Sequence, residues 1–144
     1  MPVSDSLGRT KGLTSIGSRF DPKETMDRLE TEIRAHGLTI FARIDHAAGA
    51  AEVGLTLRPT ELIVFGNASS GTPLMQSVQT AGIDLPLKVL VWQDAEGKTW
   101  LSYNEPSWIA RRHGIANAKR VVSGMGAALR AIVRAAAESH EQGN

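Results

Sequence analysis

The feature that most constrains the fold is a pair of β-strand patterns joined by a very short connection. The patterns run from Leu85 to Gln93 and from Lys98 to Tyr103, with Asp94-Ala95-Glu96-Gly97 between them. A connection this short joins antiparallel neighbours, because a parallel crossover needs a dozen or more residues. The other strand and helix patterns interleave without a regular βα repeat, which also favours an antiparallel sheet backed by helices.

The first part of the chain predicts a strand, a helix and a second strand. Residues 13–20 alternate loosely and predict the first strand. Asp21 is a typical N-cap and Pro22 suits the first helical position, so a helix is expected from here to a left-handed stop at Gly37. Residues 38–44 predict the second strand. Its alternation places Leu38, Ile40, Ala42 and Ile44 inward, and Thr39 and Arg43 outward.

The middle of the chain predicts a central strand between two short helices. Asp45 is a candidate N-cap for an Ala-rich helix over 46–53. Residues 61–65 are apolar on both faces, which is typical of a central strand. Residues 67–72 are expected to form a loop, and Thr72-Pro73 to begin the next short helix.

The last part of the chain predicts a long amphipathic helix over 115–136, after a short helical turn that begins at Asn104-Glu105-Pro106. The predicted fold class is therefore α+β, in the order strand, helix, strand, strand, short helix, strand, strand, helix. A further short helix is expected between the second and third strands. We expect a flexible N-terminal arm over 1–12 and a single domain over 13–144.

Composition excludes several functional classes. The 144 residues include no cysteine, which excludes disulfides, thiolate catalysis and sulfur-ligated metals. The net charge of +1 gives no overall attraction to nucleic acid or anionic membranes. No apolar run is long enough to span a membrane and the first residues show no signal-peptide pattern, so a soluble, cytoplasmic protein is expected. No histidine spacing indicates a metal site, and no cofactor is predicted.

Six short patterns occur in order between about Leu13 and Ile115. They are Ile44-Asp45-His46-Ala47-Ala48, Leu57-Arg58-Pro59-Thr60-Glu61, Phe65-Gly66-Asn67, Gly71-Thr72-Pro73-Leu74-Met75, Leu85-Pro86-Leu87-Lys88 and Trp100-Leu101-Ser102-Tyr103-Asn104. In this order they resemble the domain of unknown function 302 family. The resemblance implies an α+β fold similar to the TATA-box-binding-protein-like class, often assembled as a dimer, and no established activity. The family usually has a proline after Phe-Gly-Asn, where this chain has Ala68.

Two segments are candidates for ligand binding in the first two thirds of the chain. Asp45 and His46 pair a carboxylate with an imidazole, the commonest general base. The alternative is that Asp45 caps a helix and His46 makes a local hydrogen bond. Asn67, Ser70 and Thr72 lie between a buried strand and a helix start, where hydroxyls and free amides could receive a phosphate or carboxylate. The alternative is a loop in which Thr72 caps the next helix.

The last predicted strand adds Tyr103 and Asn104 as candidates. Tyr103 lies near Trp92 and Trp100, and the two-residue period places Trp100 on the face opposite Tyr103. Aromatic rings with polar tips suit a small-molecule pocket, a subunit interface or ordinary core packing, and core packing is the favoured interpretation.

The predicted C-terminal helix carries a basic surface and two internal glycines. Residues 111–134 include Arg111, Arg112, Lys119, Arg120, Arg130 and Arg134 and no acidic residue. This pattern favours a solvated face or contact with an acidic partner surface over nucleic-acid binding. Gly124 and Gly126 each cost a helix roughly 1 kcal/mol relative to alanine, which favours close approach of another backbone, from the sheet or a symmetry-related helix. The alternative is that the helix kinks or breaks there.

Three functional hypotheses follow. The favoured one is a domain that binds a small ligand, an anionic one included, between the sheet and the helices. The second is an enzyme in which His46 acts as the general base, and the sequence leaves open whether there is any catalysis. The third is a structural or interaction module whose homodimer is the functional unit.

Overall fold

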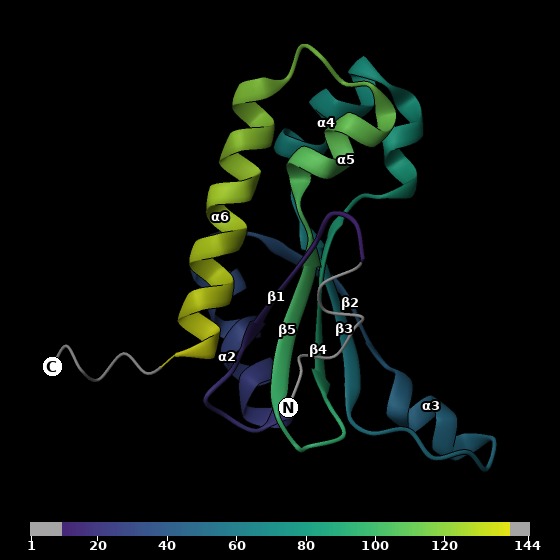
Figure 1. The fold of residues 1–144 in the computed structure, drawn as a ribbon. Helices are drawn as coiled ribbons and strands as arrows, with labels where there is room; N and C mark the ends of the chain where they lie inside the picture. Colours follow the sequence, from purple (N-terminus) through teal and green to yellow (C-terminus); the bar gives the residue numbers. More distant parts are fainter. Residues whose placement is uncertain (1–9, 139–144) are drawn as a thin grey trace, which may run out of the picture.

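The computed structural model describes residues 10–138, so most of the predicted N-terminal arm at 1–12 lies outside the described residues. Figure 1 shows the chain as strands and helices that alternate irregularly along the sequence. In chain order the elements are β1 (Leu13–Gly17), α2 (Pro22–Ala35), β2 (Thr39–Asp45), α3 (His46–Glu52), β3 (Thr60–Gly66), α4 (Ala68–Ser77), a 3-10 turn η1 (Gln79–Ile83), β4 (Leu87–Gln93), β5 (Thr99–Asn104), α5 (Pro106–His113) and α6 (Lys119–Ala137).

The strands form one antiparallel sheet in the order β1-β5-β4-β3-β2, which confirms the predicted α+β class. Strands β4 and β5 form the predicted hairpin. Its turn is held by Asp94, whose Oδ1 accepts hydrogen bonds from the backbone N–H groups of Glu96 and Lys98, both at 2.9 Å. A turn carboxylate that bonds its own backbone in this way fixes the register of the two strands.

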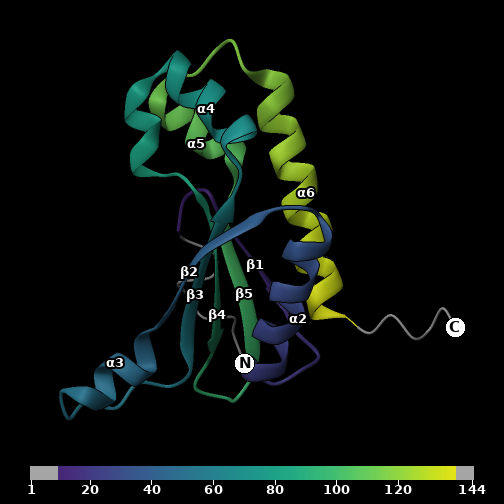
Figure 2. The same cartoon turned by 180° about the vertical axis from the view of Figure 1, so that it is seen from behind.

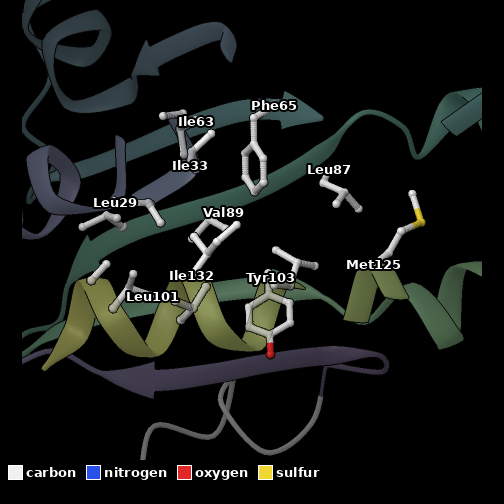
Figure 3. Packing of buried hydrophobic residues seen from close by; sticks show 14 of the residues in the cluster. Leu29, Ile33, Ile63, Phe65, Leu87, Val89, Leu101, Tyr103, Met125 and Ile132 are labelled. Atoms are coloured by element: carbon white, nitrogen blue, oxygen red, sulfur yellow. The ribbon is translucent and has the colours of Figure 1, made fainter. Parts of the chain in front are cut away.

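Helices α2 and α6 lie side by side against one face of the sheet (Figures 1 and 2). The start of α2 is the one predicted, since Asp21 Oδ1 accepts from the Glu24 N–H at 2.8 Å and Pro22 is the first helical residue. Between these helices and the sheet lies the main core, part of which Figure 3 shows. Its largest fully buried members are Phe65, Met26, Leu29, Ile33, Ile63, Leu74, Leu101, Leu129, Ile132, Val89, Val91 and Val133.

The opposite face of the sheet is covered by no helix among residues 10–138. We call it the open face; its residues alternate with the core residues along each strand. Trp92 and Trp100 stack there with ring centroids 6.2 Å apart. The Trp92 Nε1–H donates to Ser102 Oγ at 2.8 Å. The apolar residues of the open face include Leu13, Ala42, Ile44, Leu62, Val64, Leu90, Trp92 and Trp100.

The predicted faces of the second strand are wrong after residue 41, because β2 contains a β-bulge. The pairing with β3 shifts between Ile40 and Ala42, so Phe41 is an extra residue. Ile40 packs against the core as predicted, but beyond the bulge the faces exchange. Ala42 and Ile44 therefore lie on the open face, while Arg43, predicted to point outward, lies on the helix side.

The new position of Arg43 gives it acidic partners on two elements. It donates to Glu61 through Nε at 2.9 Å and to Glu30 of α2 through Nη1 at 2.8 Å. These hydrogen bonds, that to Glu61 foremost, raise the pKa of Arg43. The hydrogen bonds from Arg34 and Arg43 lower the pKa of Glu30. The bulge thus converts an expected solvent-facing arginine into a link between β2, β3 and α2.

Between β2 and β3 the chain leaves the sheet and forms a protrusion (Figures 1 and 2). We call residues 46–58 the α3 protrusion. Asp45 caps its helix as predicted, with Oδ1 accepting from the Ala48 N–H at 2.9 Å. No residue of α3 is buried. Val53, Leu55 and Leu57 are 71%, 65% and 46% exposed, so the protrusion carries apolar side chains that its own domain does not cover.

The predicted loop at residues 67–72 is wrong, because α4 already begins at Ala68. Asn67 is the N-cap: its Oδ1 accepts from the Ser70 N–H at 2.8 Å. Pro73 consequently lies inside the helix rather than at its start. At the other end of the chain α6 begins at Lys119, and Ile115, the predicted start, precedes it while still packing against the core.

Candidate functional site

A cavity of about 400 Å³ lies where α4, the first half of α6 and one end of the sheet meet. Its walls come from four separate segments of the chain, and most of its lining is apolar. The lining residues are Leu38, Phe41, Gly66, Asn67, Ala68, Ser70, Gly71, Thr72, Met75, Leu85, Pro86, Leu87, Arg120, Val121, Gly124, Met125 and Ala128. Leu87 and Met125 are seen at one edge of the core cluster in Figure 3, so the cavity adjoins the core.

The Asn67 cap places the first turns of α4 at the cavity wall. β3 ends at Gly66, and the Asn67 side chain then accepts hydrogen bonds from the Ser70 N–H and from the Ser69 hydroxyl, the latter at 2.9 Å. These bonds turn the chain from the strand directly into the helix. Ser70 and Thr72 lie in the first turns of α4 and therefore line the cavity.

Two features on other elements shape the cavity. The bulge turns Phe41 out of the regular alternation of β2, and its ring becomes part of the lining. On α6, Gly124 leaves room: a Cβ at this position would meet no atom within 4 Å. The close approach of another backbone that the sequence predicted at Gly124 is therefore absent within residues 10–138. At Gly126 a Cβ would meet only the Nη1 end of Arg130, at 3.4 Å.

Arg120 is the one charged residue in the cavity lining. It forms no hydrogen bond or ion pair with any other part of residues 10–138. The polar groups that share the lining are Asn67, Ser70 and Thr72. The cavity thus combines an apolar wall, a few hydrogen-bonding groups and one guanidinium whose charge the described residues leave unneutralised.

The predicted site residues lie in three different places. Asn67, Ser70 and Thr72 line the cavity. Asp45 and His46 lie at the base of the α3 protrusion, and both are exposed. The described structure therefore does not gather these five residues around one ligand.

Tyr103 and Asn104 belong to a third place. Both border a separate hollow of about 400 Å³ on the open face. The ring of Tyr103 is itself 4% exposed and packs in the core (Figure 3). Burial, reinforced by the nearby Glu105 carboxylate, raises the pKa of Tyr103. The favoured interpretation of Tyr103 as a core residue agrees with this position.

Sequence reasoning missed a hydrogen-bonded group between η1 and α5, which we call the Asp84 cluster (Asp84, Arg112 and His113). His113 Nε2 lies 2.6 Å from Asp84 Oδ2, and Arg112 Nη1 donates to the same oxygen at 2.8 Å. The His113 Nδ1 lies 3.0 Å from the hydroxyl oxygen of Thr80. The Asp84 and His113 side chains are only 13% and 8% exposed. The cluster ties α5 to the segment before β4.

No group of three or more His, Asp or Glu side chains suited to a metal ion occurs within residues 10–138. No helix in the same range is both long enough and apolar enough to cross a membrane.

Comparison with known proteins identifies relatives of the chain. Residues 14–134 match the family model described as domain of unknown function DUF302. The structure resembles the crystal structure of an uncharacterized conserved protein DUF302 from Bacillus stearothermophilus. The TM-score is 0.79 at 18% sequence identity, over 88% of this chain and 99% of that one. At this identity the likeness concerns the fold.

Curated relatives carry a different name. A protein named fluoride-specific ion channel FluC 1 from Brucella suis is 48% identical over 104 residues, which is 72% of this chain and 41% of that protein. A FluC 1 protein from Brucella abortus is equally similar over 38% of its length. This chain therefore spans about two fifths of the length of these relatives, and the rest of each lies outside the match.

Proposed function

The chain belongs to the DUF302 family, which is defined by a domain of unknown function, so we propose a function from the cavity. The cavity binds a small amphipathic molecule that carries one anionic group. The observation that supports this proposal is an apolar cavity of about 400 Å³ whose one charged lining residue, Arg120, is unpaired within residues 10–138. Ligand sites generally combine an apolar wall with a few polar groups in this way.

The proposed ligand has its apolar part against the inner wall and its anionic group at the rim. Met75, Leu85 and Met125 supply apolar surface, and methionine side chains adapt to ligands of different shape. Burying about 200 Å² of apolar ligand surface is worth about 5 kcal/mol. Arg120 is exposed, so a charge-assisted hydrogen bond to it adds about 1.5 kcal/mol, the low end of the usual range.

The first experiment is native mass spectrometry of protein purified gently without added ligand. An unexplained small mass on the protein supports the proposal and identifies the ligand. A second experiment titrates three probes by calorimetry: decanoate, decanol and decylamine. We expect decanoate to bind at least tenfold more tightly than decylamine, because only the carboxylate complements Arg120.

Three variants locate the binding. Gly124→Leu fills the cavity from α6 and should abolish decanoate binding, while the matched control Ala127→Leu, on an exposed position outside the lining, should not change it. Arg120→Met should weaken decanoate by about tenfold and leave decanol unchanged. Decanoate binding that survives Gly124→Leu would contradict the assignment to this cavity.

His46 separates this proposal from the enzyme hypothesis. His46 does not line the cavity, so His46→Ala should leave decanoate affinity unchanged. An enzyme that uses His46 as its general base would instead lose its turnover in this variant.

The cytoplasmic location expected from the sequence stays a prediction.

The FluC-named relatives favour a second candidate function, a domain that accompanies a fluoride channel. The support is that 104 residues of this chain match each of them at 48% identity while covering only about two fifths of their length. Deleting the matching segment from the Brucella suis relative and measuring fluoride efflux from proteoliposomes tests this. Unchanged efflux would argue against it.

We further propose that the functional unit is a homodimer, as the family resemblance implies. Sedimentation velocity of the purified chain at tens of micromolar tests this directly, because the masses of monomer and dimer differ by a factor of two.

A further inference from the structure

The basic residues of α5 and α6 gather around a second hollow. Residues 111–134 include six basic residues and no acidic one. Three of them, Arg111, Lys119 and Arg130, line a hollow of about 420 Å³ between α5 and the first half of α6. Figures 1 and 2 show α5 and the start of α6 at the same end of the molecule, where residues 114–118 join them. This hollow shares no lining residue with the cavity described above.

The first turns of α6 separate the hollow from the cavity. Lys119 and Val122 line the hollow, whereas Arg120 and Val121 line the cavity. Neighbouring residues of a helix point in different directions, so α6 presents one cation to each space. The hollow is therefore a separate place in the fold.

The three cations of the hollow have no counter-ion in the described part of the chain. Arg111, Lys119 and Arg130 form no hydrogen bond or ion pair with any other residue in the range 10–138. Arg112, by contrast, is held by Asp84. Cations gathered around one hollow repel one another, and an anion bound between them offsets that repulsion.

The position of Arg130 depends on the second glycine of α6. The Cβ that Gly126 lacks would lie 3.4 Å from Arg130 Nη1. The guanidinium therefore lies back along α6, beside the bare backbone of the preceding turn. Gly126 and Arg130 line the hollow together, so this glycine, which the cavity does not use, has a place in the hollow.

One carboxylate shares the lining with the cations. The Oε2 of Glu105 accepts a hydrogen bond from the Thr14 hydroxyl at 2.6 Å, which ties this side chain to β1. Glu105 forms no ion pair with the cations of the hollow, and the lining keeps an excess of two positive charges. Ser107 and Ser123 add two exposed residues with hydroxyl groups.

We propose that this hollow binds a small ligand that carries at least two adjacent phosphate groups. Guanidinium and ammonium groups are common partners of phosphate oxygens, and three of them suit a ligand with several negative charges. The cations surround one hollow rather than follow a groove, which favours a small ligand over a strand of nucleic acid. The inference does not depend on the ligand proposed for the cavity.

The test is calorimetric titration with pyrophosphate, with phosphate and sulfate as comparison anions, at equal ionic strength and without divalent cations. We expect pyrophosphate to bind at least about tenfold more tightly than phosphate, because it contacts more than one cation at a time. Arg111→Gln and Arg130→Gln, one variant from each helix, should each weaken pyrophosphate binding about tenfold. Both positions are exposed, so the fold should be unaffected, and far-UV circular dichroism checks this.

The matched control is Arg134→Gln. It removes the same charge from an exposed position one turn after Arg130, outside the lining. Its pyrophosphate affinity should change by less than about twofold, because salt screens charges that do not contact the ligand. Glu105→Gln should act in the opposite direction and tighten pyrophosphate binding by about threefold.

The outcomes separate a built site from general surface charge and from the cavity. Failure of pyrophosphate to bind, or an equal loss of affinity in Arg134→Gln and Arg130→Gln, overturns the inference. Tight binding of a thymidine oligonucleotide without binding of pyrophosphate overturns it in favour of a nucleic-acid surface. Gly124→Leu should leave pyrophosphate affinity unchanged, and Arg130→Gln should leave decanoate affinity unchanged, so a failure here does not affect the function proposed for the cavity.

Discussion

Gly124→Ala should stabilise the protein, because Gly124 lies inside a long helix and its Cβ position is open. α6 runs from Lys119 to Ala137, and a glycine inside a helix costs about 0.5–1 kcal/mol relative to alanine. A Cβ at position 124 meets nothing within 4 Å, so no steric cost offsets this gain. We expect the free energy of unfolding to rise by about 0.5–1 kcal/mol, which corresponds to roughly 2–4 °C in Tm for a domain of this size.

The matched control is Gly114→Ala, because Gly114 has the left-handed φ of 69° at the end of α5. An L-residue is strained there, so this variant should lower the free energy of unfolding by about 1 kcal/mol. Both variants are measured by urea titration with far-UV circular dichroism, and their m-values should equal that of wild type.

The result that would refute the reasoning is a destabilised Gly124→Ala variant beside a Gly114→Ala variant that behaves as expected. It would mean that another backbone lies against Gly124 in solution, as the two glycines of α6 suggest from sequence alone. The surface of the proposed homodimer would then have to include α6.

Three further variants test other contacts by equilibrium unfolding. Asp94→Asn should lower Tm at neutral pH, because hydrogen bonds from the Trp100 N–H and from backbone N–H groups lower the pKa of Asp94 below 3.8 in the folded state. The gap in Tm between the variant and wild type should close as the pH falls from about 5 toward 2, because Asp94 then becomes protonated. A gap that does not depend on pH would contradict this. Asp84→Asn should cost about 1–3 kcal/mol by breaking the Asp84 cluster, whereas Asp27→Asn, in an exposed pair, should change stability by less than about 0.5 kcal/mol. Asn67→Ala should cost about 1 kcal/mol through loss of the α4 cap.

Local signals predicted most of the fold correctly. The Asp94–Gly97 connection placed two strands side by side, and the Asp21 and Asp45 caps fixed where two helices begin. These predictions succeeded because each depends on a few neighbouring residues and on hydrogen bonds within them.

Two predictions were wrong for physical reasons: the faces of β2 after Phe41 and the loop at residues 67–72. A bulge leaves the hydrophobic pattern of β2 looking regular, so the exchange of faces after Phe41 is visible only in the pairing with β3. The residues after Asn67 are rich in serine, glycine and threonine, which suggests a loop, yet the cap is strong enough to start α4 there.

The candidate site was predicted in part. Asn67, Ser70 and Thr72 were found because they follow a buried strand, and all three line the cavity. Arg120 was noticed only as one of several basic residues, since nothing local shows that it lines a cavity. The Asp84–His113 contact joins residues 29 positions apart, which a local pattern does not reveal.

The bulge at Phe41 changes which residues of β2 face the helices. Before it the even-numbered residue Ile40 faces the helices, and after it the odd-numbered residue Arg43 does so. Deleting this single residue would restore an unbroken alternation, because Ile40 would stay opposite Phe65 and Ala42 opposite Val64. Arg43 would keep Glu30 and Glu61 as partners, and the cavity would lose the part of its lining that Phe41 supplies. Among descendants of this sequence, loss of position 41 should therefore change the cavity and leave the pairing of β2 with β3 intact.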